Sequence, residues 1–122
     1  MSSCLMAGAI MLALAPGDQF SLSWTHSVER QAWSETWALR DGQLQLIRAA
    51  VKGSGAGMEP GEGGRFLDGW WVWAPDLPPV SALHLAASGL TPSAWQLCGA
   101  SCIDLGAAPA EVIDVTPCPP QP

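Results

Sequence analysis

The chain has 122 residues, which is enough for one domain with a hydrophobic core and too few for two. Its net charge is −6 at pH 7, and its five Lys and Arg residues are spread between Arg30 and Arg65, which excludes the clustered positive charge that nucleic acids and anionic membranes require. Hydrophobic residues make up 48% of the chain against 13% charged residues, so we expect a folded single domain over residues 1–122 and not a disordered chain.

The N-terminal segment carries an apolar run over residues 4–15 that ends at a Pro-Gly pair. Twelve residues are too few to span a bilayer as a helix, so no membrane span is expected in this chain. The run has the length of the hydrophobic part of an export signal, but no Lys or Arg precedes it. We therefore predict that residues 1–17 hold a buried first strand, and the remnant of an export signal is the alternative.

Residues 20–51 are predicted to form three antiparallel strands, and the rest of the fold is expected to form around this meander. Apolar and polar residues alternate in FSLSW and again in WSETWAL, as in strands with one buried face. We expect the first turn at residues 29–32 and the second at Asp41-Gly42, a dipeptide that strongly favours a tight hairpin. The frequent glycines and prolines elsewhere exclude long helices. The predicted fold class is all-β: a small antiparallel sandwich or barrel-like domain stapled by disulfides.

The turns predict which residues face each other across the meander. In the first hairpin Trp24 is expected beside Trp37, and in the second Leu39 is expected beside Leu44. The same registers place His26 opposite Glu35.

Glu35 in turn is expected opposite Arg48, so that His26, Glu35 and Arg48 form a polar row on the apolar face. A carboxylate between two potential cations is expected to stay ionised. The row is interpreted as a structural ladder, a binding site, or a hydrolytic site in which Glu35 orients His26 as the base. Ser27 is a poor nucleophile for that base because adjacent strand residues point to opposite faces. A metal site of His26, Glu29 and Glu35 is a further alternative, with only one imidazole.

The glycine-rich segment 52–64, KGSGAGMEPGEGG, differs from a phosphate-binding loop because no Lys-Ser or Lys-Thr follows its last glycine. The carboxylates of Glu59 and Glu62 would repel phosphate. We predict a loop that is the most mobile part of the domain; the alternative is a lid or a backbone amide site for a small anion near Lys52.

The C-terminal half is predicted to form further short strands. Asp68-Gly69 favours a tight turn before the WWVW segment, whose tryptophans either pack or line a stacking cleft. Residues 76–80 are expected to be an irregular connector, and residues 81–87 a weak strand in which His84 is structural. Residues 94–105 are predicted to form a last hairpin with its tip at residues 99–101, and residues 111–115 a short strand.

Four cysteines allow three disulfide pairings. Cys98 and Cys102 flank the tip of the predicted last hairpin, which favours a bond between them and leaves Cys4 to pair with Cys118. Two disulfides imply an oxidising compartment. The alternative is a cytosolic protein with buried free thiols.

Several motifs in fixed order carry a resemblance to a known family: WTHSVER, a downstream Trp-x-Glu, KGSGAGMEP, DGWW and WQLC-x3-C. Together they resemble a bacterial family catalogued only as a domain of unknown function (number eighteen-fifty), and the likeness covers nearly the whole chain. Members of that family are often encoded beside, or fused to, membrane subunits of TAXI-type TRAP transporters, which use periplasmic receptors to import small organic anions. The residues that match its recurring pattern are His26, Ser27, Glu29, Glu35, Gly55, Gly57 and Met58.

The resemblance implies a periplasmic accessory domain and supplies no catalytic mechanism. We therefore expect a domain that binds a transporter membrane subunit or receptor, or a small organic anion. Because the chain is acidic, a bound anion needs a local cationic site, which Arg48, Lys52 and His26 are expected to supply. A hydrolytic enzyme or a metal-binding domain using His26 and Glu35 is the alternative; an enzyme is less favoured, and no cofactor is expected.

Overall fold

The computed structural model describes residues 4–25, 32–52, 64–85, 95–105 and 112–118. In this part of the chain the regular elements are β-strands, which pair antiparallel in two sheets and confirm the predicted all-β class. One sheet contains β3 (Gln19–Thr25), β4 (Ala32–Arg40), β5 (Gln43–Lys52), β6 (Arg65–Leu67), β7 (Trp70–Trp73), β9 (Trp95–Cys98) and β10 (Cys102–Leu105). The other contains β1 (Cys4–Ala7), β2 (Ile10–Ala13), β8 (Leu83–Leu85) and β11 (Ile113–Pro117).

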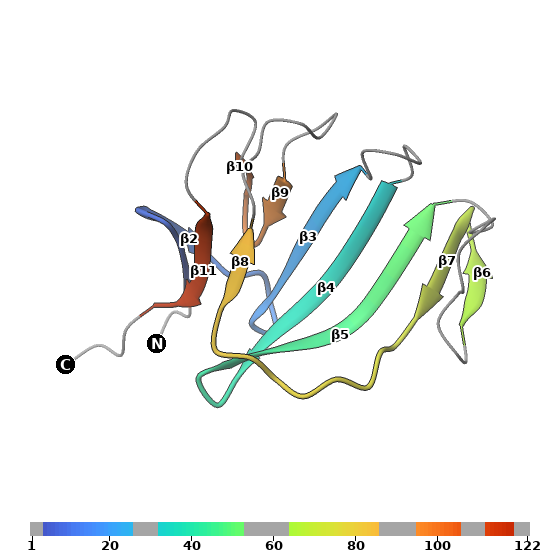
Figure 1. Ribbon diagram of the computed structural model, residues 1–122, viewed down its shortest axis with the longest axis horizontal. Coiled ribbons are helices and arrows are strands. Elements are labelled where there is room, and N and C mark those ends of the chain that lie inside the picture. The colour runs from blue at the N-terminus through green and yellow to red at the C-terminus, as the bar shows by residue number, and fades with distance from the viewer. Residues whose placement is uncertain (1–3, 26–31, 53–63, 86–94, 106–111, 119–122) are drawn as a thin grey trace.

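The described strands form a seven-stranded sheet in the order β10-β9-β3-β4-β5-β7-β6 and a four-stranded sheet in the order β2-β1-β11-β8. Figure 1 shows the four-stranded sheet at one end of the molecule, with the first and last strands of the chain side by side in it. The predicted meander is confirmed: β3, β4 and β5 lie at the centre of the larger sheet.

Two Asp-Gly pairs make the tight turns that the sequence predicts. Asp41 and Gly42 have φ of 54° and 75°, and Asp68 and Gly69 have φ of 50° and 86°. Positive φ at both central residues is the conformation whose twist matches that of a hairpin, and Asp and Gly adopt it at low cost. The first pair joins β4 to β5 and the second joins β6 to β7, so two of the predicted strand connections are fixed locally.

The predicted register of the first hairpin is wrong by four residues. Trp24 pairs with Trp33, and Phe20 pairs with Trp37. The pairing is described as far as Thr25 and Ala32, and residues 26–31 between them lie outside the described residues. Because the error is an even number of residues, each side chain keeps its predicted face.

The second hairpin follows its predicted register only as far as a β-bulge. Leu39 pairs with Leu44 as expected, but Trp37 pairs with Leu46 and Thr36 with Arg48. The intervening Ile47 is an extra residue in β5, so two residues oppose one on β4.

The bulge changes which face the second half of β5 presents. Before it Leu46 is buried; beyond it Ala49 and Val51 are buried while Arg48 is exposed. The alternation thus shifts by one residue, which turns Arg48 to the outer face of the sheet.

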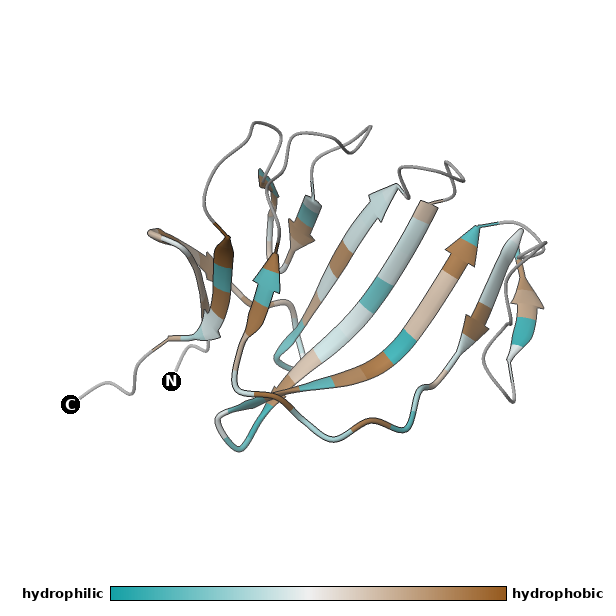
Figure 2. Cartoon of the chain, viewed as in Figure 1, coloured by the Kyte–Doolittle hydropathy of each residue, from teal (hydrophilic) through white to brown (hydrophobic). Residues whose placement is uncertain are grey.

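The hydrophobic core lies between the two sheets. The inner face of the seven-stranded sheet contributes Phe20, whose ring stacks with that of Trp37 at a centroid distance of 6.3 Å, and Leu97, which is fully buried. The four-stranded sheet contributes Leu5 and Val115, also fully buried. Figure 2 shows the central strands β3 and β4 mostly pale, because their serines, threonines and tryptophans lie near the middle of the hydropathy scale. Burial of one face by a second sheet makes the domain a sandwich.

The apolar N-terminal run forms a hairpin of two strands, where one strand was predicted. Gly8 makes the bend between β1 and β2 with φ of 60°. Backbone hydrogen bonds from the Gly8 N–H to the Asp114 carbonyl (3.0 Å) and from the Cys118 N–H to the Cys4 carbonyl (3.0 Å) fasten this hairpin to β11.

The remaining strands agree with the sequence-based expectations. The last hairpin consists of β9 and β10, in which Cys98 pairs directly with Cys102. The connector after β7 has no strand, but Val80 makes a two-way backbone bridge with Leu44 (2.7 and 2.9 Å) that links it to β5. The glycine-rich loop, predicted to be mobile, lies outside the described residues from position 53 to 63.

Both predicted disulfides are confirmed. Cys4 bonds Cys118 and Cys98 bonds Cys102. The first joins residues 114 positions apart and the second residues only 4 positions apart.

We expect the long-range disulfide to contribute more stability than the short one. In the chain-entropy model, replacing Cys4 and Cys118 by Ala lowers the free energy of unfolding by up to about 4.8 kcal/mol, and replacing Cys98 and Cys102 lowers it by up to about 2 kcal/mol. Urea unfolding of the two double variants measures both losses. A larger loss for the Cys98/Cys102 pair would contradict the chain-entropy account of this fold.

Candidate functional site

The polar row that the sequence predicts does not form in the structure. Glu35 lies opposite Leu22 on one side and opposite Ala49 on the other. Arg48 lies opposite Thr36 and faces away from Glu35, because the bulge in β5 reverses its direction. His26 lies outside the described residues, and its expected partner position opposite Glu35 is occupied by Leu22.

Glu35 instead lies among apolar side chains on the inner face of the sheet. Its carboxylate oxygen Oε1 accepts a hydrogen bond from the indole Nε1–H of Trp37 at 3.1 Å. Burial disfavours the charged form and raises the pKa of Glu35 above its ordinary value of 4.5, although the Trp37 hydrogen bond opposes this shift. The expectation that Glu35 lies between two cations is therefore wrong in its register, because Arg48 faces the other side of the sheet and Leu22 holds the position opposite Glu35 where His26 was expected.

The inner face near Glu35 is a cluster of packed tryptophans. The ring of Trp24 stacks on Trp33 at 6.1 Å and tilts against Trp95 at 4.9 Å, while Trp73 meets Trp33 edge-on at 6.2 Å. Aromatic pairs of this geometry stabilise a fold beyond the area they bury. Packing thus accounts for Trp73 in the WWVW segment, whereas Trp70 lies on the opposite face.

The outer face of the same sheet carries a pocket of about 340 Å³ between two arginines. Arg65 on β6 pairs with Val72 on β7, and Val72 pairs on its other side with Ala50 of β5, two residues beyond Arg48. Val72 therefore lies between the two arginines, which approach it from different strands. The pocket, called the arginine pocket below, is lined by Ile47, Arg48, Arg65, Val72, Trp73 and Ala74.

Neither guanidinium of this pocket is neutralised by a carboxylate of the described chain. The salt bridge among described residues joins His84 to Asp114 on the four-stranded sheet, remote in topology from β5 and β6. Arg48 and Arg65 are both exposed and make no ion pair with a described residue. In a chain of net charge −6, two of the five Lys and Arg residues thus line one pocket, which makes it a local cationic site in an acidic protein.

The other predicted binding residues fall in two groups. Lys52 lies on the outer face, with its Nζ 5.4 Å from the ring centroid of Trp70, and does not line the arginine pocket. The remainder lie outside the described residues: His26, Ser27, Glu29, Gly55, Gly57 and Met58.

His84 pairs with Asp114 across β8 and β11, with 2.7 Å between Nδ1 and Oδ1. Both side chains are more than 60% exposed, so this contact contributes little stability even when the imidazole is protonated. No group of three His, Cys, Asp or Glu side chains within the described ranges is placed to hold a metal ion. His26 and Glu29, which the metal alternative requires, are not among the residues tested.

Sequence reasoning found Arg48 and missed Arg65. The signal for Arg48 facing outward is present in LQLIRAAV, where the apolar positions change parity after Leu46. A bulge satisfies both halves of that pattern, whereas unbroken alternation buries Arg48 on the inner face. Arg65 joins Arg48 in the pocket because β6 turns at Asp68-Gly69 and pairs with β7, which pairs with β5. The two arginines are 17 residues apart in the sequence, so no local pattern links them.

The comparison with protein families identifies the central part of the chain. Residues 20–105 match the model of the family described as Domain of unknown function (DUF1850). The chain belongs to this family. The match spans the meander, the β6–β7 hairpin and the β9–β10 hairpin, so it includes both arginines of the pocket. No curated protein and no solved structure matches the chain. Within the described residues, no helix is long and apolar enough to cross a membrane.

We expect Glu35→Gln to stabilise the protein at neutral pH. The pKa of Glu35 is higher in the folded than in the unfolded state, so folding binds protons above pH 4.5. Below pH 4.5 the raised pKa of Glu35 makes its whole contribution to the free energy of unfolding. This contribution is lost as the pH rises through the pKa of Glu35 in the folded state. The Gln carbonyl still accepts the hydrogen bond of Trp37 and never ionises.

Urea unfolding at pH 4 and pH 7 tests this expectation. The free energy of unfolding of the Gln variant should exceed that of the native protein at pH 7, and this excess should be smaller at pH 4. The exposed Asp76→Asn serves as the matched control. A variant that is less stable than the native protein at pH 7 would show that the ionised carboxylate is stabilising.

Proposed function

We propose that the protein is an extracytoplasmic binding domain that holds a small organic anion in the arginine pocket. The observation that carries the proposal is the pair of exposed arginines, Arg48 and Arg65, that line one pocket without a carboxylate partner in the described chain. Arginine presents a planar set of donors that fits a carboxylate with two hydrogen bonds.

The rest of the lining indicates what kind of anion fits. Val72, Ile47 and Ala74 offer an apolar surface between the two guanidiniums, and Trp73 borders it. Small-molecule sites typically combine such an apolar lining with a few convergent polar groups. A ligand with a hydrocarbon or aromatic body and one or two carboxylates satisfies both parts of this lining. Inorganic phosphate satisfies only the charged part.

The acidic surface adds selectivity to the site. A net charge of −6 repels anions in general, so an anion binds only where local cations outweigh that field.

The two disulfides support an extracytoplasmic location, because such bonds persist in oxidising compartments. The proposed setting is the periplasm. The resemblance described above adds a candidate partner, a membrane subunit or receptor of a TAXI-type TRAP transporter. In that setting the domain presents an organic anion to the transporter or senses it. Co-purification with a membrane subunit of a TAXI-type TRAP transporter tests the partner separately from the ligand.

Isothermal titration with succinate and benzoate, using succinamide and benzamide as uncharged matches, tests the anion site. We expect at least one carboxylate to bind and its amide to bind about tenfold more weakly or not at all, since a hydrogen bond to a charged group contributes roughly 1.5–3 kcal/mol. Arg48→Gln and Arg65→Gln should each weaken binding about tenfold, and added salt should weaken it further.

Arg40→Gln is the matched control, because Arg40 is exposed at the end of β4 and lies outside the pocket. Equal binding of carboxylate and amide, or equal losses for the Arg40 and Arg48 variants, would refute the assignment of the anion to this pocket.

A further inference from the structure

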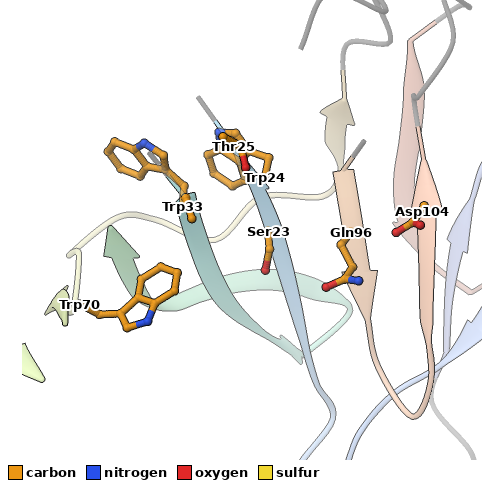
Figure 3. A pocket seen from close by; sticks show the side chains of 8 residues that line it. Ser23, Trp24, Thr25, Trp33, Trp70, Gln96 and Asp104 are labelled. Carbon is orange, nitrogen blue, oxygen red and sulfur yellow. The ribbon is translucent and has the colours of Figure 1, made fainter. Parts of the chain in front are cut away.

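A second pocket, of about 310 Å³, lies on the seven-stranded sheet beside β3 and β4. Figure 3 shows the indole of Trp70 on one side of it and the side chains of Gln96 and Asp104 on the other, with Ser23 between them. The Trp70 pocket, as it is called below, is lined by Ser23, Trp24, Thr25, Ala32, Trp33, Trp70, Gln96 and Asp104.

Strand register brings its polar groups into one line. Asp104 on β10 pairs with Gln96 on β9, and Gln96 pairs with Ser23 on β3. Paired residues on neighbouring strands are about 5 Å apart, so the carboxylate, the amide and the hydroxyl follow one another at regular intervals on one face. Ser34 continues the line on β4, where its hydroxyl accepts a hydrogen bond from Ser23 at 3.5 Å.

These polar groups retain hydrogen-bonding capacity. The side chains of Gln96 and Asp104 are exposed and make no side-chain hydrogen bond or ion pair within the described chain. Gln96 offers donors and an acceptor, Asp104 offers acceptors, and Ser23, whose O–H donates to Ser34, offers an acceptor. The line therefore suits a ligand that carries many groups able both to donate and to accept.

The aromatic side of the pocket complements this line. Trp70 is half-buried and its ring borders the cavity. The Nζ of Lys52 lies over the same ring at 5.4 Å, in a cation–π contact that uses one face of the indole. An organic cation placed against this ring would be repelled by the ammonium of Lys52. An organic anion would be repelled by Asp104. The two opposite charges therefore give the pocket no overall preference for a cation or an anion, which suits an uncharged ligand.

We propose that the Trp70 pocket binds a neutral saccharide. The C–H face of one sugar ring stacks on the apolar face of the indole, while the hydroxyls of further rings exchange hydrogen bonds with Ser23, Gln96 and Asp104, because three strands separate β7 from β9. This site is separate from the arginine pocket, shares no lining residue with it, and stands independently of the organic-anion proposal.

Tryptophan fluorescence and calorimetric titration with cellotriose, maltotriose and chitotriose test the proposal, with choline as the cationic probe. We expect at least one trisaccharide to bind at millimolar concentration and choline not to bind. Trp70→Ala should weaken saccharide binding about tenfold, in line with the loss of one stacking surface. Gln96→Ala, which changes an exposed side chain and preserves the fold, should weaken it about threefold.

Two further variants separate this site from its alternatives. Asp104→Asn should retain saccharide binding because the amide still hydrogen-bonds hydroxyls, whereas it would abolish binding of a cation. Arg48→Gln should leave saccharide affinity unchanged. The proposal is overturned if no trisaccharide binds, if choline binds and depends on Asp104, or if both Trp70→Ala and Gln96→Ala leave the affinity unaltered.

Discussion

The bulge in β5 is the constraint on which both faces of the large sheet depend. Leu44 and Leu46 precede it and contribute to the core, and Ala49 and Val51 follow it and are also buried. Unbroken alternation would bury Arg48 opposite Glu35 among tryptophans, and removing such charged groups from water costs several kcal/mol per ion. One extra residue at Ile47 removes this conflict, because it lets both apolar halves of the strand face inward and delivers Arg48 to solvent beside the β6–β7 hairpin.

The two faces of the seven-stranded sheet therefore carry different kinds of side chain. The inner face is packed with tryptophans and with the core residues of the second sheet, and its one described ionisable group, Glu35, is held by Trp37 in an environment that favours the neutral form. The outer face has small serine, threonine and alanine side chains over β3 and β4, bounded by larger ones on the flanking strands. The Trp70 pocket lies over these small side chains, whereas the arginine pocket lies farther along the sheet, between residues of β5, β6 and β7.

Local chemistry made most of the fold predictable. The Asp-Gly turns, the alternating strands and the cysteines beside the last hairpin each specify structure within a few residues. The predictions that failed concern contacts between residues far apart in the sequence, or a strand whose regular alternation is interrupted. The register of β3 on β4 depends on a connection whose length the sequence does not mark, and the row of His26, Glu35 and Arg48 assumed uninterrupted pairing. Arg65 and Gln96 were missed because they join their sites only through strands paired across the sheet.

Intermolecular NOEs from protonated benzoate to the methyl groups of otherwise deuterated protein test the central claim most directly, because they report which face the anion touches. The account predicts contacts to the methyls of Val72 and Ile47 in the arginine pocket, and their loss in Arg48→Gln. Contacts to the inner-face methyls of Leu46 and Val51, or to none of these four side chains at saturating benzoate, would contradict it.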